Sequence, residues 1–468
     1  MDTTKTLPIL KSLRKEEWTE LEAFLQSPYF NKDVTVVQLF QILKDMFQQQ
    51  SGPLKINKEA VAKLLWPNRP YSAKTFTYVL SKLNKLTEHF LALERMQQSA
   101  FELQLAAINV FSERNLLKNY RAEKRALQKS LKESGESEFL LFKAQARLAE
   151  IEDLHYVRQK RRVHDISIQE AAHLVDCSYY LQRLHQACSM LDRQHILQAN
   201  YELALSEDWF NHLRQHLAKQ PPIIQLYLFI FQMLNDEEQE AHFQELKDGL
   251  QEHHSDISPP DLTTIYQFAV NYCARKIRAG REPYVEEALQ LYLTAIEAGW
   301  FIINDELSPW TYANVVKLFL RQQKFEEAKA FIHQYLPLLP DRFRDNAFHY
   351  NLAELYYYTN DYEQAQEHLI QVAYEDLNYY LGARVLLAKI YWQTEAEDAL
   401  SSLLAAFIMF LQRNKQLSKN LKNTYLNFCK ILARILRTPT EKRAALKSTI
   451  TETSPLTDRD WLLNTLST

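Results

Sequence analysis

Two His–Cys pairs are the residues whose types and spacing could hold a metal ion. His173 and Cys177 are four residues apart, and His185 and Cys188 are three apart, all within one predicted helix, residues 167–200. Imidazole and thiolate groups at this spacing share a helix face, and both are zinc ligands. The two pairs lie too far apart along a straight helix to share one ion, and neither has a facing partner. We therefore expect core packing and predict no metal site.

Signatures of catalysis are absent from the sequence. It contains no HExxH or GxSxG motif, and its 6 Gly residues are too dispersed for the phosphate-binding loops GxGxxG and GxxxxGKS/T. The 4 Cys residues form no CxxC motif and are expected to be reduced and buried (Cys177, Cys188, Cys273 and Cys429). We predict no catalytic residue and no cofactor, which leaves an enzyme as the least favoured class of function.

The composition favours an all-α fold. Only 6 of the 468 residues are Gly, whereas an average usage of about 7% would give roughly thirty. Leu, Ala, Glu, Lys and Gln dominate, and all are good helix formers. The first residues lack the apolar core of a signal peptide, and the longest apolar run, residues 403–411, is about half of a membrane span. We expect a cytoplasmic protein without a membrane partner.

The charge of the chain is unevenly distributed. The formal net charge is −3, which gives no overall attraction to nucleic acid or to an anionic membrane. However, residues 51–130 contain 14 Lys and Arg against 6 Asp and Glu, and residues 411–447 contain 10 against 1. These basic regions, and the run RQKRRVH at 158–164, are the places where a phosphate contact would be expected. The simpler interpretation is that these cations are solvated or suit helix ends.

Three stretches near the C-terminal end repeat one pattern. They occupy residues 311–332, 349–370 and 383–404. When they are aligned, Ala328, Ala365 and Ala399 coincide, and these positions are 37 and 34 residues apart. A period near 34 indicates stacked helical hairpins, each of which is too small to bury its own apolar face. Looser hairpins are predicted at 221–251 and 258–299, and a last helix at about 417–437.

These units resemble the tetratricopeptide repeat, in which small residues lie where two helices cross and large ones fill the gaps beside them. In residues 347–380 the matching positions are Leu352, Ala353, Tyr356, Tyr362, Ala365 and Leu369. The resemblance covers about residues 221–437 and is clearest at 308–412. It implies a right-handed α-α superhelix over residues 135–468 with C-terminal capping helices, after a helical N-terminal module, residues 1–134. The usual glycine of the repeat is replaced by Val316, Ala353 and Leu387, and the closing proline occurs once, as Pro340.

The resemblance also implies a concave groove lined by residues of the first helix of each hairpin. By position these are Trp310, Lys317, Arg321, Tyr350, Glu354, Tyr357, Tyr358, Arg384, Tyr391 and Trp392. Aromatic and basic side chains suit a partner segment with acidic or C-terminal carboxylate character. The residues of the carboxylate clamp that binds chaperone tails in some members are not in place. We expect a non-catalytic scaffold that binds a protein segment, unless these aromatic side chains pack against the next hairpin instead.

Residues 58–84 suggest an alternative function. Two predicted helices flank WPNRPYS in this region, and the pair faintly resembles a helix-turn-helix that would present Ser72, Lys74, Tyr78 and Lys82. The turn is longer than usual and contains two prolines. The alternative is a DNA-binding regulator in which the repeats act as a sensor or oligomerisation region.

Overall fold

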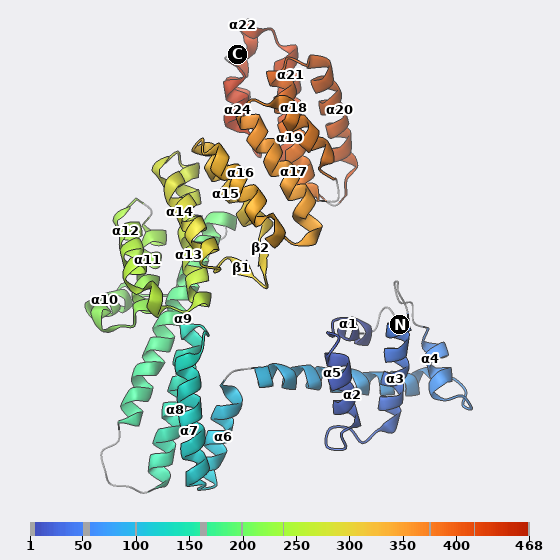
Figure 1. Cartoon of the computed structure of the whole chain (residues 1–468), viewed down its shortest axis with the longest axis vertical. Helices are drawn as coiled ribbons and strands as arrows, with labels where there is room; N and C mark the ends of the chain where they lie inside the picture. Colours follow the sequence, from blue (N-terminus) through green and yellow to red (C-terminus); the bar gives the residue numbers. More distant parts are fainter. Residues whose placement is uncertain are drawn as a thin grey trace. The chain divides into compact units, whose positions relative to one another are not determined.

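The computed structural model describes residues 5–49, 57–98, 101–159, 166–197, 200–236, 238–373, 376–415 and 417–466. The described residues are almost entirely α-helical, which confirms the predicted all-α class (Figure 1). The chain divides into two compact units. Unit 1 consists of Met1–Ser134 and Phe139–Ser178, and unit 2 of Gly135–Glu138 and Tyr179–Thr468. Among the described residues, no helix combines the length and the apolar character needed to cross a membrane.

The first part of unit 1 contains five helices around their own core. They are α1 (Thr6–Lys11), α2 (Glu17–Gln26), α3 (Val34–Gln49), α4 (Lys58–Leu65) and α5 (Ala73–Gln98). The bounds of α4 are those predicted, and its start is fixed because the Asn57 side chain accepts a hydrogen bond from the Glu59 amide at 2.9 Å. Leu21, Phe40 and Phe76 are fully buried in the core.

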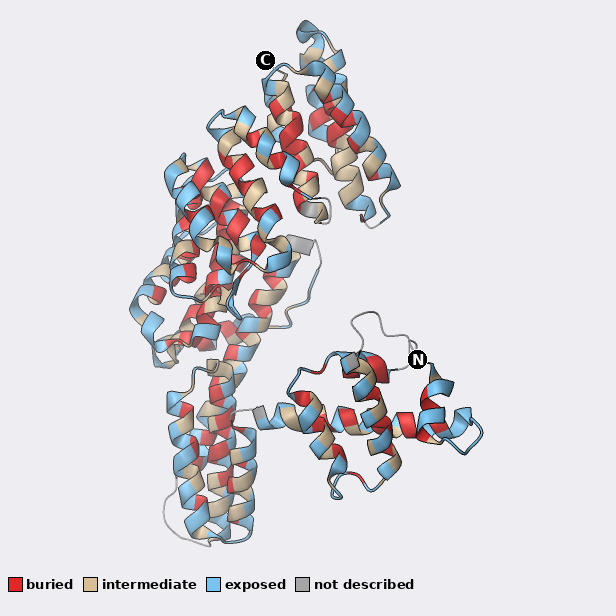
Figure 2. Cartoon of the chain, turned by 45° about the vertical axis from the view of Figure 1, so that its right-hand side comes forward, coloured by how far each residue is buried: buried red, intermediate tan, exposed pale blue. Residues whose placement is uncertain are grey.

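A second group of helices in unit 1 has a separate core. It comprises α6 (Glu102–Glu113), α7 (Leu117–Glu133), α8 (Glu138–Arg158) and the first part of α9 (Ser167–Leu197). Ile108 and Leu127 are fully buried, and Leu148 is nearly so. Figure 2 shows buried residues along the inner faces of these helices. Most of the basic run predicted at 158–164 lies outside the described residues, which end at residue 159 and resume at 166.

Unit 2 is built mainly from helices that pair in chain order. They are α10 (Glu207–Gln215), α11 (Pro222–Asn235), α12 (Ala241–His253), α13 (Pro259–Arg278), α14 (Pro283–Glu297), α15 (Pro309–Arg321), α16 (Phe325–Tyr335), α17 (Asp341–Tyr358), α18 (Tyr362–Gln371), α19 (Leu377–Gln393), α20 (Glu397–Arg413) and α21 (Lys419–Arg437). Three short helices follow: α22 (Thr440–Arg443), α23 (Lys447–Glu452) and α24 (Arg459–Asn464). Neighbouring hairpins contact one another, including α15 with α17 and α17 with α19, as a helical repeat requires.

The three clearest hairpins share one turn. Three residues separate α15 from α16, α17 from α18, and α19 from α20. The middle residue of each turn has a left-handed backbone, with φ of 59° at Gln323, 62° at Asn360 and 55° at Glu395. In each turn the amide of the following residue donates to a carbonyl five positions earlier at 2.9–3.0 Å. This is a Schellman ending, which satisfies the last carbonyls of the first helix.

The small residues that define the repeat lie at or near the helix contacts. Ala328 and Ala365 are fully buried, whereas Ala399 is half-buried. In the first hairpin, the buried Tyr312 hydroxyl of α15 donates to the Ile332 carbonyl of α16 at 2.7 Å. The aligned alanines therefore have a common steric role in the first two hairpins and a weaker one in the third.

One short strand pair was not predicted. Strands β1 (Ile302–Ile303) and β2 (Glu306–Leu307) pair in antiparallel fashion around Asn304 and Asp305, whose φ values are 52° and 61°. Asn and Asp tolerate the left-handed conformation that such a two-residue turn requires. Two-residue strands are too short to produce an alternating hydrophobic pattern, which explains why the sequence did not reveal them.

Candidate functional site on the first helices of the repeats

The ten residues predicted to line a groove lie on three helices that contact one another in order. Trp310, Lys317 and Arg321 lie on α15, four residues lie on α17, and Arg384, Tyr391 and Trp392 lie on α19. We call the surface formed by these residues the first-helix face. Some of these side chains are open to solvent and others are covered by the chain itself, so the face has two parts.

The part on α15 and the end of α17 is open. Trp310 is 57% exposed and Tyr358 is 53% exposed, and Lys317 is also exposed. Arg321 forms an ion pair with Glu282, which lies in the turn between α13 and α14 of the preceding hairpin. Partial burial is the main cause that raises the pKa of Tyr358, and the Glu354 carboxylate raises it further. Lys317 and Arg321 oppose this shift. These cations therefore act electrostatically on the Tyr358 hydroxyl.

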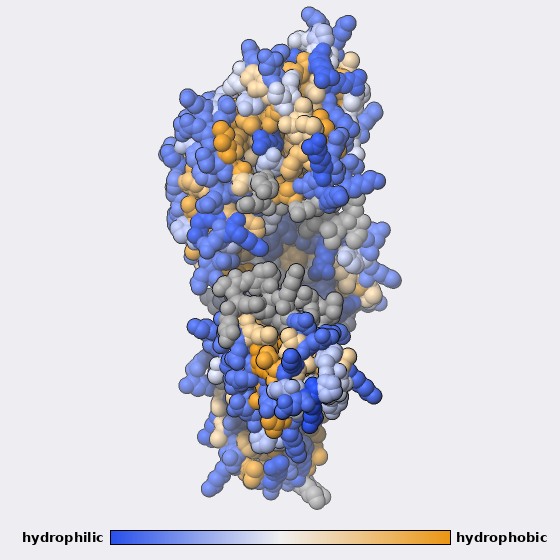
Figure 3. All heavy atoms as spheres, turned by 90° about the vertical axis from the view of Figure 1, so that its right-hand side faces the viewer, coloured by the Kyte–Doolittle hydropathy of each residue, from blue (hydrophilic) through white to orange (hydrophobic). Residues whose placement is uncertain are grey.

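The view in Figure 3 shows one face of the molecule with its hydropathy. On the part that belongs to unit 2, apolar side chains gather in the middle and hydrophilic ones border them. Large exposed apolar side chains in unit 2 include Trp310, Tyr358, Ile370 and Met409. Exposed aromatic side chains with neighbouring cations are the composition expected of a surface that binds another chain.

Tyr350 and Glu354 form a polar pair at the contact of α17 with α19. The Tyr350 hydroxyl donates to Glu354 Oε1 at 3.0 Å, and its ring lies 5.5 Å from that of Tyr379. Gly382 on α19 provides the space, because a Cβ there would lie 2.9 Å from the Tyr350 hydroxyl oxygen. Burial, followed by the Glu354 charge, raises the pKa of Tyr350 well above its usual value. The other Glu354 oxygen, Oε2, is buried and has no hydrogen-bond partner among the described residues.

Tyr357 and Trp392 are covered by the C-terminal segment, which we define as residues 455–464 and which includes α24. The Trp461 ring lies 6.4 Å from that of Trp392 at an interplanar angle of 78°. Burial raises the pKa of Tyr357 to about 12, and the nearby Trp461 side chain opposes this rise. Arg384 instead stacks on Tyr380 of its own helix, with its guanidinium carbon 4.7 Å from the ring centroid. Two of the ten predicted residues thus bind a segment of the same chain.

Three residues that hold the C-terminal segment were missed by the sequence interpretation. Lys389 forms an ion pair with Asp458 and lies 5.7 Å from the Trp461 ring centroid. Asn427 of α21 donates to the Pro455 carbonyl at 2.9 Å, and the Phe428 ring lies 6.2 Å from that of Trp461. Lys389 lies one helical turn before Trp392, so their shared face was a usable signal. The contacts from α21 depend on how the last helices fold back, which the sequence pattern does not show.

A cleft of about 370 Å³ borders Trp392. It is lined by Tyr391 and Trp392 of α19, by Glu395 and Glu397 near the start of α20, and by Arg443 of α22, among others. The Arg443 guanidinium carbon lies 5.1 Å from the Trp392 ring centroid. Trp392 therefore contacts both a cation and the C-terminal segment.

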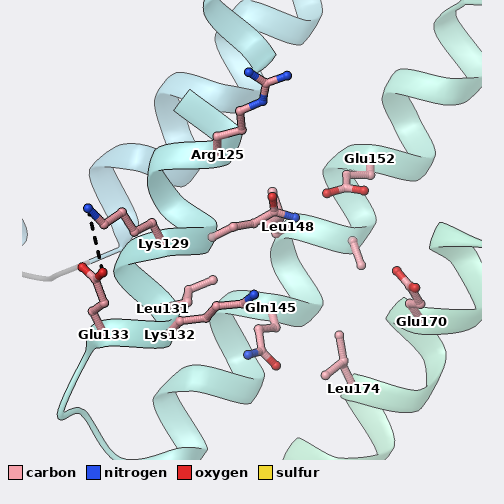
Figure 4. A pocket seen from close by; sticks show the side chains of 12 residues that line it. Arg125, Lys129, Leu131, Lys132, Glu133, Gln145, Leu148, Glu152, Glu170 and Leu174 are labelled. Atoms are coloured by element: carbon pink, nitrogen blue, oxygen red, sulfur yellow. Dashed lines mark ion pairs between the residues drawn. The ribbon is translucent and has the colours of Figure 1, made fainter. Parts of the chain in front are cut away.

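Unit 1 contains a larger cleft of about 630 Å³ between α7, α8 and the start of α9 (Figure 4). Its lining includes Leu131, Leu148 and Leu174, while Lys132 and Glu170 approach from opposite sides in the view. The described lining contains no Ser, Thr, Cys or His, so this cleft offers no hydroxyl, thiol or imidazole nucleophile.

The helix-turn-helix-like element is formed by α4, the residues 66–72 and α5. Ser72, Lys74 and Tyr78 are exposed, and Tyr78 is 65% exposed. Lys82 forms an ion pair with Asp33 at 3.0 Å. Although burial acts in the opposite direction, the Lys82 hydrogen bond holds the pKa of Asp33 below its usual value. One of the four predicted nucleic-acid residues is therefore already neutralised within the fold.

Of the residues with metal-ligand spacing, Cys177 and Cys188 are buried as expected, whereas His173 and His185 are exposed. His173 Nε2 lies 3.7 Å from Cys177 Sγ, and the pair has no third ligand, since no group of three or more His, Cys, Asp or Glu suited to a metal exists among the described residues. The His185 ring packs 5.6 Å from that of Tyr227, and partial burial lowers the pKa of His185. All four cysteines are free and buried, as expected.

Comparisons of the chain with models of known protein families, with curated proteins and with solved structures give no match. The resemblance to the tetratricopeptide repeat therefore rests on the residue pattern, the pairing of neighbouring helices and the shared turn of three hairpins.

Proposed function

We propose that this protein is a non-catalytic interaction scaffold whose helical hairpins form a tetratricopeptide-like, right-handed superhelix and bind a partner segment on the first-helix face. The observation that carries the proposal is the open part of that face. Trp310 and Tyr358 expose more than half of their surface on neighbouring first helices, α15 and α17. Lys317, also exposed, supplies positive charge on the same face. Rigid aromatic anchors beside a cation suit an acidic segment of another protein.

A pull-down with the full chain tests this proposal. Partners recovered with the wild type are quantified against those recovered with Trp310→Ala/Tyr358→Ala. Each large aromatic anchor of an interface contributes about 2 kcal/mol or more, so the double variant is expected to lower recovery at least tenfold. The matched control is Ile370→Ala/Met409→Ala, which removes two side chains that are 78% and 50% exposed on the second helices α18 and α20. Equal recovery with the wild type and the aromatic variant would reject the first-helix face as the binding surface.

The alternative is a DNA-binding regulator that uses α4 and α5. It is supported by the exposure of Ser72, Lys74 and Tyr78 at the start of α5, and weakened by the pairing of Lys82 with Asp33. It predicts binding to pooled genomic DNA at low salt that decreases steeply with salt and with Lys74→Glu. Absence of a mobility shift at low salt would eliminate it.

We further propose a cytoplasmic location. The support is that the four cysteines carry no disulfide, which is typical of proteins from reducing compartments.

A further inference from the structure

The C-terminal segment lies where a partner of a tetratricopeptide-like scaffold would bind. It contacts α19 through Lys389 and Trp392 and α21 through Asn427 and Phe428, and its Trp461 side chain acts on the pKa of Tyr357 of α17. The other two short C-terminal helices, α22 and α23, precede it in the chain. The segment therefore covers the α19 part of the first-helix face and extends onto α21.

The contacts of the segment follow a simple pattern. Asp458 pairs with Lys389, and Trp461, three residues later, packs between Trp392 and Phe428. Asp458 is the N-cap residue of α24 and Trp461 lies in its first turn, so the start of one short helix presents the carboxylate and the indole together. Lys389 serves both groups, because its ammonium also lies 5.7 Å from the Trp461 ring centroid, within the range of a cation–π contact. Leu462 adds a fully buried apolar anchor.

The segment depends on this face for its structure. Its helix, α24, has six residues, which is too short for a helix to be stable alone in water. Its N-cap residue, Asp458, has a left-handed backbone with φ of 51°, which Asp adopts less easily than Gly. A short element held by a few side chains, at the end of a chain, can leave its site without unfolding the hairpins beneath it.

We propose that the surface formed by Lys389 and Trp392 of α19 and by Asn427 and Phe428 of α21 recognises short segments of partner proteins in which an acidic residue precedes a Trp by three positions at the start of a helix, and that residues 455–464 occupy this site until such a partner displaces them. The inference rests on the proposed scaffold function and specifies its partner. Lys389 selects the carboxylate, while Trp392 and Phe428 select the indole. Trp is suited to this role because its large ring can pack against both aromatic rings and lie beside the Lys389 ammonium.

The first test uses a fluorescent peptide with the sequence of residues 453–466 and the full chain. A tethered segment competes at an effective concentration of about millimolar, so the wild type is expected to bind the peptide weakly. The Asp458→Ala/Trp461→Ala chain, in which the competitor is impaired, is expected to bind it at least tenfold more tightly in fluorescence anisotropy. Adding Lys389→Glu to that variant should abolish the gain.

Peptide variants test the recognition pattern. A peptide with alanine in place of Asp458 and Trp461 should not bind. A peptide with Asp460→Ala should bind like the unmodified one, because Asp460 is exposed and lies outside the described contacts to Lys389. If the folded double variant binds the peptide no better than the wild type, or if both altered peptides bind equally, the proposal is wrong.

Hydrogen exchange on the wild type covers the case in which the double variant does not fold. A displaceable segment requires the amides of 459–464 to exchange at least tenfold faster than those in the buried part of α21. Exchange at the same rate as α21 would show a permanent cap and overturn the proposal. Neither peptide binding nor hydrogen exchange involves Trp310 or Tyr358. The proposed role of the C-terminal segment can therefore be wrong while the scaffold function on the open part of the face is upheld. The scaffold function can likewise fail while the role of the segment is upheld.

Discussion

Two histidines that face each other across the α17–α18 hairpin should make the stability of unit 2 sensitive to mild acid. His349 Nδ1 and His368 Nδ1 lie 2.9 Å apart, so one nitrogen carries a proton and donates it to the other. Burial lowers the pKa of both rings, and His349 lowers that of His368 further. Asp345 on α17 and Glu367 on α18 oppose these shifts. The folded hairpin therefore favours neutral rings.

The sign of the effect follows from proton counting. The unfolded chain binds a proton on each ring as the pH falls through about 6.5. The folded pair can accept only one additional proton, because a second would place two N–H groups against each other. Two positive charges 2.9 Å apart would also repel by about 1.4 kcal/mol even at the dielectric constant of water. The unfolded state thus takes up about one more proton, and stability decreases as the pH falls below about 6.5.

The magnitude follows from the same count. One proton of difference over about 1.5 pH units, from 6.5 to 5.0, lowers the free energy of unfolding by about 2 kcal/mol. Both rings are only half-buried, so solvent screening reduces the expected loss to about 1–2 kcal/mol.

The assay is urea unfolding followed by circular dichroism at pH 7.5 and pH 5.0. His368→Gln keeps a hydrogen-bonding side chain and removes the titration, so it should lose about 1–2 kcal/mol less than the wild type between the two pH values. The matched control is His254→Gln, at an exposed histidine, which should behave like the wild type. An equal loss in the wild type and in His368→Gln would refute the reasoning, because other titrating groups, including His185, are common to both proteins.

Two further predictions concern the interior. A thiol reagent should modify the native chain only very slowly and should modify all four cysteines in denaturant. The reason is that all four are buried, and burial raises the pKa of Cys177 to about 11 and that of Cys429 to about 12. Rapid modification of the native chain would contradict the buried placement. Asp192→Ala should lower the free energy of unfolding by about 3 kcal/mol, since the buried Asp192 accepts from Arg275 at 2.9 Å and from Asn271 at 3.0 Å. A change below about 0.5 kcal/mol in urea unfolding would show that this pair does not stabilise the fold.

Local signals in the sequence predicted much of the fold. The helix α4 was predicted at its observed bounds, and Ala328 and Ala365 are buried as the repeat pattern required. Periodicity and proline positions report such features because they depend on neighbouring residues. The short helix α10 was not predicted, since the pattern before residue 221 was too weak to define an element.

The candidate site was predictable only in part, because its state depends on contacts between distant residues. The repeat register placed Tyr357 and Trp392 on the first-helix face, but their cover comes from Trp461, which is 69 residues beyond Trp392 in the chain. Likewise, Lys82 was expected to be available to nucleic acid, and its partner Asp33 lies 49 residues away. A single sequence gives residue types and local order, whereas such pairings are decided by how helices fold back on one another.

The shared turn of the three hairpins has a mechanical consequence. Gln323, Asn360 and Glu395 hold a left-handed backbone that glycine would adopt more easily. A side chain at such a position narrows the range of accessible angles, so each bend acts as a stiff joint instead of a loose one. When the repeats are pulled or twisted, the angle between the two helices of a hairpin should change little. The strain is then taken up at the contacts between hairpins, which makes those contacts the elastic element of unit 2.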